Sequence, residues 1–375
     1  MDVLCGMNRN TEAFFALVRA GLWEIEIQLQ SFGPIDYSDI YRLAEEQSVI
    51  GLVAAGFEHV ADLRPPKKVV LQFVGQTLQL EQRNMAMNYF IGVLVDKMKD
   101  AGIHSLLVKG QGIAQCYERP NWRSCGDVDF FLSESNYEKA KTFLVPMASS
   151  VENEGEYKKH LGMTIEPWVV ELHGNLRCGL SYKMDEVIDE IQKNVFFGGD
   201  VRSWMNGETP VSLPGADSDV LFVFTHFLKH FYKEGLGLRQ ICDWCRLLWT
   251  YRESLKHNLL ESRIRKMGLM SEWKVFGAFA VDYLGMPAET MPFYSRETKW
   301  KNKAKLVCKF VMEVGNMGHN RDSSYFDKPY LVRKMYSFGR RCGDLLHHVR
   351  IFPMDSFKFF PSIVIHGMKS AANGE

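Results

Sequence analysis

The chain has 375 residues, of which 46% are apolar and 24% charged, and its 45 basic residues balance 45 acidic ones. This length allows two or three domains, or one domain with large additions. The zero net charge argues against binding to long nucleic acid, and the sequence contains no run of about 18 apolar residues that would predict a membrane span. We find neither a secretory signal nor a small-domain disulfide spacing among the eight cysteines, so we expect a cytoplasmic protein.

The first hundred residues are expected to be helical. Residues 11–22 begin with a capping threonine and space their apolar side chains along one helix face. Residues 37–57, after a Gly-Pro turn, and the longer segment 77–102 show the same kind of pattern. We therefore predict an N-terminal helical region over residues 1–102.

Three short apolar segments then predict a small sheet. Residues 104–110 and 127–133 are the first two strands, with a short helix or turn and a loop between them. After a helix at 133–144, residues 163–174 form the third strand, in which Pro167 implies an edge or a bulge.

Helices return in the second half of the chain, most clearly at 218–233 and 238–255. No internal repeat and no Ser/Gly/Pro-rich linker is found, so we expect the parts to pack together. The sequence predicts an α/β (α+β) fold, with a mixed α/β core at 103–205 between the N-terminal helical region and a C-terminal helical domain at 206–375.

Two aspartates open the second predicted strand. Residues i and i+2 of a strand point to the same face, so Asp127 and Asp129 project together while Val128 and Phe130 face a core. Two carboxylates this close repel each other and raise one pKa, and a divalent cation such as Mg²⁺ removes that penalty. The alternative is a turn whose acidic side chains are simply solvated.

The neighbouring segments supply further candidates for the same site. Lys109 and Gly110 end the first strand just before a short helix, where backbone N–H groups and the helix dipole favour a phosphate. Glu171, near the end of the third strand, would complete a three-carboxylate cluster if the strands are adjacent. The alternatives are an ordinary turn for Lys109 and Gly110, and an exposed edge position for Glu171.

Two other groups of residues allow metal binding. His226 and His230 lie four apart on a helix, so they share a face and could bind zinc with Asp243 or His173. Packing or hydrogen bonding at a domain interface is the alternative. The C-x-x-C at 242–245 lacks a second pair, and we interpret it as two buried cysteines on a packed helix.

The order of elements resembles the core of the polymerase-β-like nucleotidyltransferase superfamily: strand, glycine turn, short helix, strand with D-h-D, helix, and strand with an acid. More narrowly, the chain resembles the uncharacterised bacterial nucleotidyltransferase family 5 through its motifs, which are K-G at 109–110, R-x-x-G-D-h-D at 123–129, acid-h-His at 171–173, H-x3-H at 226–230 and D-x-x-R-L at 243–247. The resemblance implies a nucleotidyltransferase-fold mixed sheet flanked by helices.

The resemblance also implies an activity, in which a nucleoside monophosphate passes from an NTP to an acceptor and pyrophosphate leaves. Two Mg²⁺ ions would be held by Asp127, Asp129 and Glu171, which are thus the implied catalytic and metal-binding residues. The nucleotide phosphates would be held by Lys109, Gly110, Gln111 and Arg123. His173, His226 and His230 would contact the substrate. The acceptor could be a small molecule, a protein side chain or an RNA end.

One residue departs from the superfamily pattern. Gln111 follows Gly110 where the superfamily usually carries a serine that helps to hold the phosphates. This leaves open a non-catalytic nucleotide-binding or interaction module of the same fold, for instance as the partner of a toxin, and a zinc hydrolase that uses the histidines. Arg123 could contact a phosphate, pair with one of the two aspartates, or lie on the surface.

Overall fold

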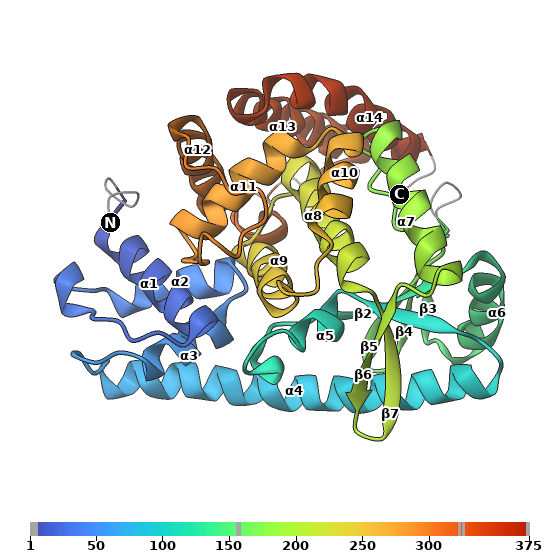
Figure 1. Ribbon diagram of the computed structural model, residues 1–375, viewed down its shortest axis with the longest axis horizontal. Coiled ribbons are helices and arrows are strands. Elements are labelled where there is room, and N and C mark those ends of the chain that lie inside the picture. The colour runs from blue at the N-terminus through green and yellow to red at the C-terminus, as the bar shows by residue number, and fades with distance from the viewer. Residues whose placement is uncertain (1–6, 155–158, 322–323, 325–326, 373–375) are drawn as a thin grey trace.

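The computed structural model describes residues 7–154, 159–321, 324 and 327–372. A long helix, α4, runs beneath both the N-terminal helices and the sheet, and the C-terminal helices lie above them (Figure 1). None of the helices within these described ranges is long and apolar enough to cross a bilayer.

The N-terminal region is helical, as predicted, but its elements differ in detail. It consists of α1 (Arg9–Trp23), α2 (Tyr37–Glu46), α3 (Ile50–Glu58) and α4 (Lys67–Asp100). The expected helix 37–57 is wrong as one element, because the chain breaks at Ser48, whose φ is 55°. Asn8 rather than Thr11 caps α1, since its side chain accepts a hydrogen bond from the backbone N–H of Thr11.

The main sheet is mixed, with strand order β1-β2-β5-β4-β3. Its strands are β1 (Ser105–Val108), β2 (Asp127–Leu132), β3 (Ser150–Val151), β4 (His160–Ile165) and β5 (Trp168–His173). Strands β2 and β5 are parallel, and the other neighbours are antiparallel.

The predicted single strand 163–174 is wrong. The chain reverses at Glu166 and Pro167, so this region forms the antiparallel hairpin β4–β5. Proline has no N–H to donate to a ladder, and here it lies in the turn rather than at an edge or a bulge. The reversal brings the start of β4 alongside the end of β5, where His160 is paired in register with His173.

A second hairpin was not predicted. Strands β6 (Val201–Asn206) and β7 (Thr209–Pro214) form a two-stranded sheet after α7 (Tyr182–Phe197). Gly207 and Glu208 form its two-residue turn, and Gly207 has a φ of 62°, the positive φ that the favoured hairpin turns require at their first central residue. Strand β7 packs against β1 and α4.

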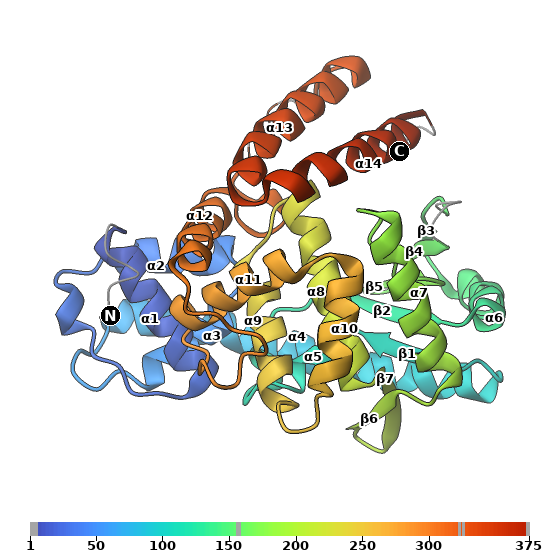
Figure 2. The same cartoon turned by 45° about the horizontal axis from the view of Figure 1, so that its top comes forward.

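The remaining helices cover the sheet and form the C-terminal half. They are α5 (Gly110–Ala114), α6 (Glu134–Leu144), α8 (Ala216–Lys233), α9 (Leu238–Thr250), α10 (His257–Met267), α11 (Met270–Asp282), α12 (Thr298–Val314), α13 (Tyr330–Ile351) and α14 (Pro353–Ala372), with short 3-10 segments at Gln30–Phe32, Pro120–Trp122, Val145–Met147 and Asn316–Gly318. Helices α13 and α14 form a pair that projects from the rest of the molecule (Figure 2).

Two apolar cores lie on opposite faces of the main sheet. One contains Val128 and Phe130 of β2 together with side chains from α4 and α6. The other is larger and joins residues of the N-terminal helices, α7–α9, α11 and α12, and it includes Phe131 of β2. The N- and C-terminal helices thus share one continuous core, and the division at residues 102 and 205 stays a prediction.

Candidate functional site

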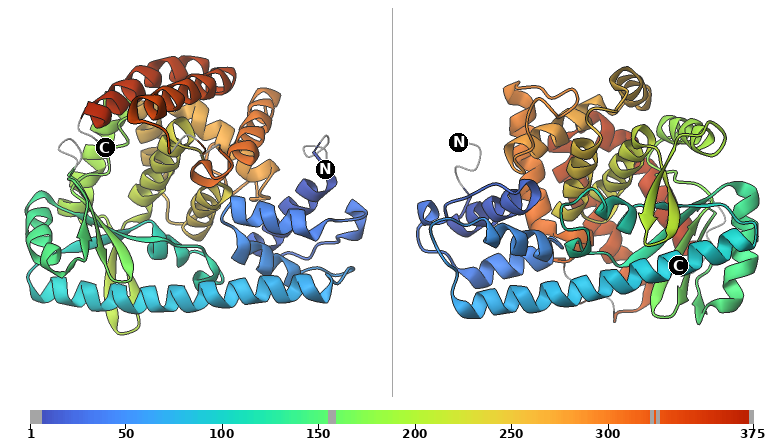
Figure 3. Two further views of the ribbon diagram at one scale, coloured as in Figure 1. Left: turned by 180° about the vertical axis from the view of Figure 1, so that it is seen from behind. Right: turned by 60° about the horizontal axis from the view of Figure 1, so that its bottom comes forward.

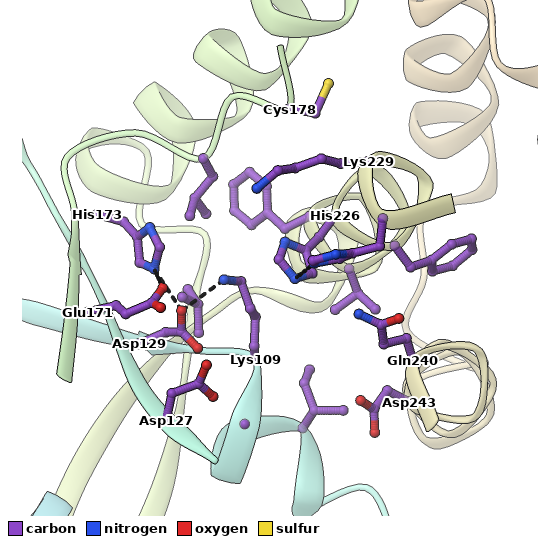
Figure 4. A pocket seen from close by; sticks show the side chains of 18 of the residues that line it. Lys109, Asp127, Asp129, Glu171, His173, Cys178, His226, Lys229, Gln240 and Asp243 are labelled. Carbon is purple, nitrogen blue, oxygen red and sulfur yellow. Dashed lines mark hydrogen bonds and ion pairs between the residues drawn. The ribbon is translucent and has the colours of Figure 1, made fainter. Parts of the chain in front are cut away.

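A cavity of about 350 Å³ lies between the sheet face that carries Asp129 and helices α8 and α9. Figure 4 shows Lys109, Asp127, Asp129, Glu171 and His173 on one side of it and the side chains of α8 and α9 on the other. A volume of this size is within the range of small-molecule sites. All of the predicted site residues line the cavity except Gln111.

The three acidic residues come together because of the register between β2 and β5. Asp129 is paired with Glu171 in this parallel ladder, and Asp127 lies two residues before Asp129. Their side chains therefore share one face of the sheet, while Val128 and Phe130 are buried on the other face. The sheet thus places three carboxyl groups in one small volume.

Asp129 is held in its ionised form by two cationic or hydrogen-bonding partners. Lys109 Nζ and His173 Nε2 lie 2.8 Å and 2.7 Å from the same oxygen, Asp129 Oδ1. Burial favours the neutral acid, but these two partners outweigh it and hold the pKa of Asp129 below its ordinary value. The pKa of Lys109 is raised, since attraction to Asp129 and Glu171 exceeds the cost of its burial.

Glu171 is fixed by two histidines. Its Oε2 atom lies 3.0 Å from His160 Nε2 and 3.3 Å from His173 Nε2. Burial again favours the neutral acid, but the hydrogen bonds from the two imidazoles prevail, and the pKa of Glu171 falls well below its ordinary value. Glu171 is therefore a carboxylate at neutral pH.

Asp127 has the opposite electrostatic environment. Its pKa is raised, first by burial and then by the nearby charges of Asp129 and Glu171. Among the described residues its carboxyl group has no hydrogen-bond or ion-pair partner. A bound cation would stabilise the ionised form of a carboxyl group that is buried beside two like charges. Three carboxylates fit Mg²⁺, which prefers hard oxygen ligands. The donor atoms present therefore fit the magnesium ions that the sequence implies.

A second donor set includes a residue that the sequence analysis missed. One ligand atom from each of His160, Glu171 and His173 lies within 4.8 Å of the others. Mixed imidazole and carboxylate ligands are typical of transition metals rather than of Mg²⁺. His160 enters the site only because β4 and β5 form a hairpin, and reading Pro167 as a turn would have indicated it.

The turn after β1 carries two residues with positive φ. Lys109 has a φ of 57° and Gly110 a φ of 37°, and a Cβ on Gly110 would lie 3.1 Å from Cys125 Sγ. Glycine is thus favoured at position 110 by both conformation and space. The first N–H groups of α5, which have no partner within the helix, begin at this turn, beside Lys109.

Gln111 does not have the position expected for a phosphate-holding side chain. Its Nε2 atom donates to Asn84 Oδ1 on α4 at 2.9 Å, so the side chain points away from the cavity. Asn84 also donates to the carbonyl oxygens of Asn121 and Arg123, each at 2.8 Å. Gln111 and Asn84 therefore tie the turn and the loop before β2 to the buried face of α4.

The expectation that Arg123 pairs with an aspartate of the acidic pair, or lies on the surface, is wrong. Its guanidinium makes a two-pronged ion pair with Asp243 of α9, with Nε and Nη2 at 3.0 Å and 2.6 Å from the two carboxylate oxygens. Both side chains are 7% exposed, and the Tyr117 hydroxyl also donates to Asp243. Arg123 borders the cavity, but its charge is already balanced.

His226 and His230 line the cavity and bond to each other. Their Nε2 atoms are 3.0 Å apart, and His230 Nδ1 donates to Glu234 at 2.6 Å. Burial lowers the pKa of both imidazoles, so both are neutral, with His226 donating to His230. Within the described ranges no group of three metal-ligating side chains includes either histidine, and Asp243 is bound to Arg123. Cys242 and Cys245 are buried free thiols, as predicted.

Arg239, in the first turn of α9, is a further cation that the sequence analysis missed. Its Nη1 atom donates to the carbonyl oxygen of Ser124 at 2.8 Å, and its side chain lines the cavity. Burial, together with the charge of Arg123, lowers its pKa. No local motif marks this residue, because only the packing of α9 against the loop before β2 brings it to the site.

A mixed sheet that presents three acids on one face, covered by helices, is the arrangement that the resemblance to nucleotidyltransferases led us to expect. A family model described as "Uncharacterised nucleotidyltransferase" matches residues 33–284, well over half of the chain. The chain therefore belongs to this nucleotidyltransferase family.

Two further comparisons add little to this assignment. No curated protein matches the sequence. The crystal structure of an antigenic nucleotidyltransferase-like protein from Paracoccidioides brasiliensis is similar over 53% of this chain and 92% of its own length, with 13% sequence identity and a TM-score of 0.32.

Proposed function

We propose that this protein transfers a nucleoside monophosphate from an NTP to an acceptor hydroxyl in a metal-dependent reaction that releases pyrophosphate. One observation carries the proposal: Asp127, Asp129 and Glu171 share one cavity wall, next to the Lys109–Gly110 turn. The new bond joins the acceptor oxygen to the α-phosphorus, and the bond from that phosphorus to the bridging oxygen of the pyrophosphate breaks.

The three carboxylates would hold the Mg²⁺ ions. When bound, such ions polarise the phosphate under attack and neutralise the charge on the leaving group. Asp127 and Asp129 would contribute ligands to both ions, whereas Glu171 would bind one and accept the proton of the attacking hydroxyl. His160 and His173 hold the Glu171 carboxylate in place through the contacts described above.

Lys109, Arg239 and the N–H groups at the start of α5 would hold the β- and γ-phosphates. Lys109 Nζ is 2.8 Å from Asp129, and we expect it to exchange this carboxylate for a phosphate oxygen when the metal-bound nucleotide enters. His226 and Gln240 lie on the opposite wall, where they can contact the base, the sugar or the acceptor. Catalysis would then consist mainly of positioning and charge stabilisation.

A calorimetric titration with ATP and GTP, with and without Mg²⁺, tests the binding step. We expect metal-dependent binding that is lost in the double variant Asp127→Ala/Asp129→Ala and retained in Glu253→Gln, whose side chain is 91% exposed and outside the cavity. Equal binding by the double variant and the wild type would refute the proposed site.

Incubation with α-labelled NTP and cell extract tests the transfer step. Label that becomes attached to an acceptor supports the enzyme. The second candidate is a non-catalytic nucleotide-binding module, and the position of Gln111 favours it, because its side chain is turned to Asn84 and leaves the turn without the usual serine hydroxyl. That candidate predicts bound but unconverted nucleotide.

A further inference from the structure

Three side chains of the β4–β5 hairpin meet at one point beside the acidic cluster. His160 begins β4 and His173 ends β5, and these two residues are paired in register. Glu171 lies two residues before His173 on the same strand. Residues that are opposite each other, or two apart on one strand, have side chains on the same face of a sheet. We call His160, Glu171 and His173 the hairpin cluster.

The contacts inside the hairpin cluster have the lengths expected between two ligands of one metal ion. Glu171 Oε2 lies 3.0 Å from His160 Nε2 and 3.3 Å from His173 Nε2. Two ligand atoms that each lie about 2.1 Å from a tetrahedral ion are about 3.4 Å apart. One ligand atom from each of the three residues lies within 4.8 Å of the others, so one ion can reach all three.

The position of His173 indicates more than a set of hydrogen bonds. Its Nε2 atom lies 2.7 Å from Asp129 Oδ1 as well as 3.3 Å from Glu171 Oε2. An imidazole nitrogen carries at most one proton, and this proton goes to the nearer oxygen, that of Asp129. The contact with Glu171 therefore has no proton of its own. A cation would accept the lone pairs of both atoms, with the proton of His173 on Nδ1.

The hairpin cluster is open to the cavity. The left view of Figure 3 shows the sheet above α4 and below the C-terminal helices. The cluster lies on the sheet face that is turned toward α8, and all three of its members line the cavity of about 350 Å³. The side chains of His160 and Glu171 are 34% and 27% exposed. An ion can therefore enter from the cavity, and its remaining coordination position faces the same space.

The donor atoms select the class of ion. Mg²⁺ prefers oxygen ligands and usually keeps several waters, whereas imidazoles suit zinc and other transition metals. Two histidines and one glutamate are the protein ligands of many catalytic zinc sites, in which the fourth position is left for water or substrate. Lys109 pairs with Asp129 Oδ1 at 2.8 Å, so an ion in the hairpin cluster leaves this ion pair in place.

We propose that the hairpin cluster binds one divalent transition-metal ion of the zinc class, through His160 Nε2, His173 Nε2 and Glu171 Oε2. The site shares only Glu171 with the proposed magnesium ligands, and the other carboxylate oxygen, Oε1, stays available to Mg²⁺. Zinc binding does not depend on the proposed transfer reaction. If that function also holds, the ion next to Glu171 is this transition-metal ion, and its open position is available to an oxygen of the substrate.

Calorimetric titration of the metal-free full chain with ZnCl₂, in the absence of nucleotide, tests the site. We expect one ion per chain and an affinity at least about a hundredfold lower in His160→Gln. Glutamine can still donate a hydrogen bond to Glu171, but it removes the imidazole ligand. His104→Gln is the matched control, since His104 is exposed and does not line the cavity, and it should bind zinc like the wild type. Equal zinc affinity in His160→Gln and the wild type would overturn the proposal.

X-ray absorption at the zinc edge of the wild type is a second test, which does not depend on the folding of a variant. We expect two imidazole ligands, and fewer than two would overturn the proposal. Circular dichroism shows whether His160→Gln is folded, and zinc should raise the melting temperature of the wild type more than that of this variant. A wild type that binds zinc but no Mg²⁺–ATP would refute only the proposed function. One that binds Mg²⁺–ATP but no zinc would refute only the zinc site.

Discussion

Asp129 and Glu171 are paired in register on the neighbouring parallel strands β2 and β5, so their carboxylates project from adjacent positions on one sheet face. Both are held ionised, Asp129 by Lys109 and His173, and Glu171 by His160 and His173. His173 is therefore shared between the two acids. Asp127, the third acid, has no such partner in the part of the chain that the structure describes, and burial and the charges of Asp129 and Glu171 raise its pKa.

We expect Asp127→Asn to lower the transfer activity without lowering the stability of the protein. The substitution removes a carboxylate whose ionised form is disfavoured by burial and by two like charges. The free energy of unfolding should stay the same or rise by about 1 kcal/mol at neutral pH. Label transfer from α-labelled NTP should fall by at least about a hundredfold, because a metal ligand is lost. Urea unfolding and the transfer assay measure the two effects, and a variant that keeps wild-type transfer would contradict the role of Asp127.

The buried ion pair between Arg123 and Asp243 should contribute to stability through both partners. Arg123→Met or Asp243→Asn alone leaves an uncompensated buried charge and should cost about 3–5 kcal/mol of unfolding free energy. The double variant Arg123→Met/Asp243→Leu should cost less than the sum of the two. A double-mutant cycle from urea unfolding measures the coupling, and strictly additive costs would show that the pair is not coupled.

Arg239 should contribute to nucleotide binding rather than to folding. If the proposed function holds, Arg239→Gln should raise the KM for NTP by about tenfold to a hundredfold, the loss expected for a charged hydrogen bond. Arg239→Lys should restore part of the affinity because it keeps the charge. Steady-state kinetics at several NTP concentrations provide the measurement. A change in kcat alone would argue against phosphate contact.

Glu272 should make stability depend on pH. It is fully buried in α11, where burial and the neighbouring Asp355 raise its pKa to about 8, and Tyr232 donates a hydrogen bond to it. Its folded-state pKa lies above its unfolded value, so the folded protein binds the extra proton, and stability falls as pH rises from about 4.5 to about 8. The loss should be on the order of 5 kcal/mol.

The variant Glu272→Gln isolates this effect, because the amide has nearly the same shape and does not ionise. We expect it to unfold at the same urea concentration as the wild type near pH 5, and at a higher concentration near pH 9. Glu253→Gln, on the surface, should keep the wild-type pH profile. An unchanged profile in Glu272→Gln would assign the pH dependence to other groups.

The faces on which the side chains of β2 lie could be predicted, because the alternation of side chains along a strand is strictly local. Alternate residues of Asp127–Phe130 must face opposite sides of any sheet, and the apolar pair Val128 and Phe130 shows which side is the core. The N-terminal helices follow from helical spacing in the same way. The family motifs indicated that Glu171 belongs to the same site as the two aspartates, which local patterns alone do not show.

Other parts of the site depend on contacts between distant segments. Arg123 and Asp243 are 120 residues apart, and no spacing rule predicts with which acidic residue a buried arginine forms an ion pair. His160 was missed because the segment before Pro167 was not recognised as a strand of its own. The β6–β7 hairpin did leave a local signal, since Gly207 and Glu208 form a two-residue turn with glycine at its first position.

Helix α4 joins the N-terminal helices to the sheet through contacts along one face. Phe73 packs in the core of the N-terminal helices, Asn84 fixes the loop before β2 and the side chain of Gln111, and Met87 packs in the core beneath β2. One inserted residue turns everything after it by about 100°, which would put these contacts out of phase. In natural variants of this protein, we therefore expect the length of α4 to change only in steps that nearly complete whole turns, such as about 7 or 11 residues.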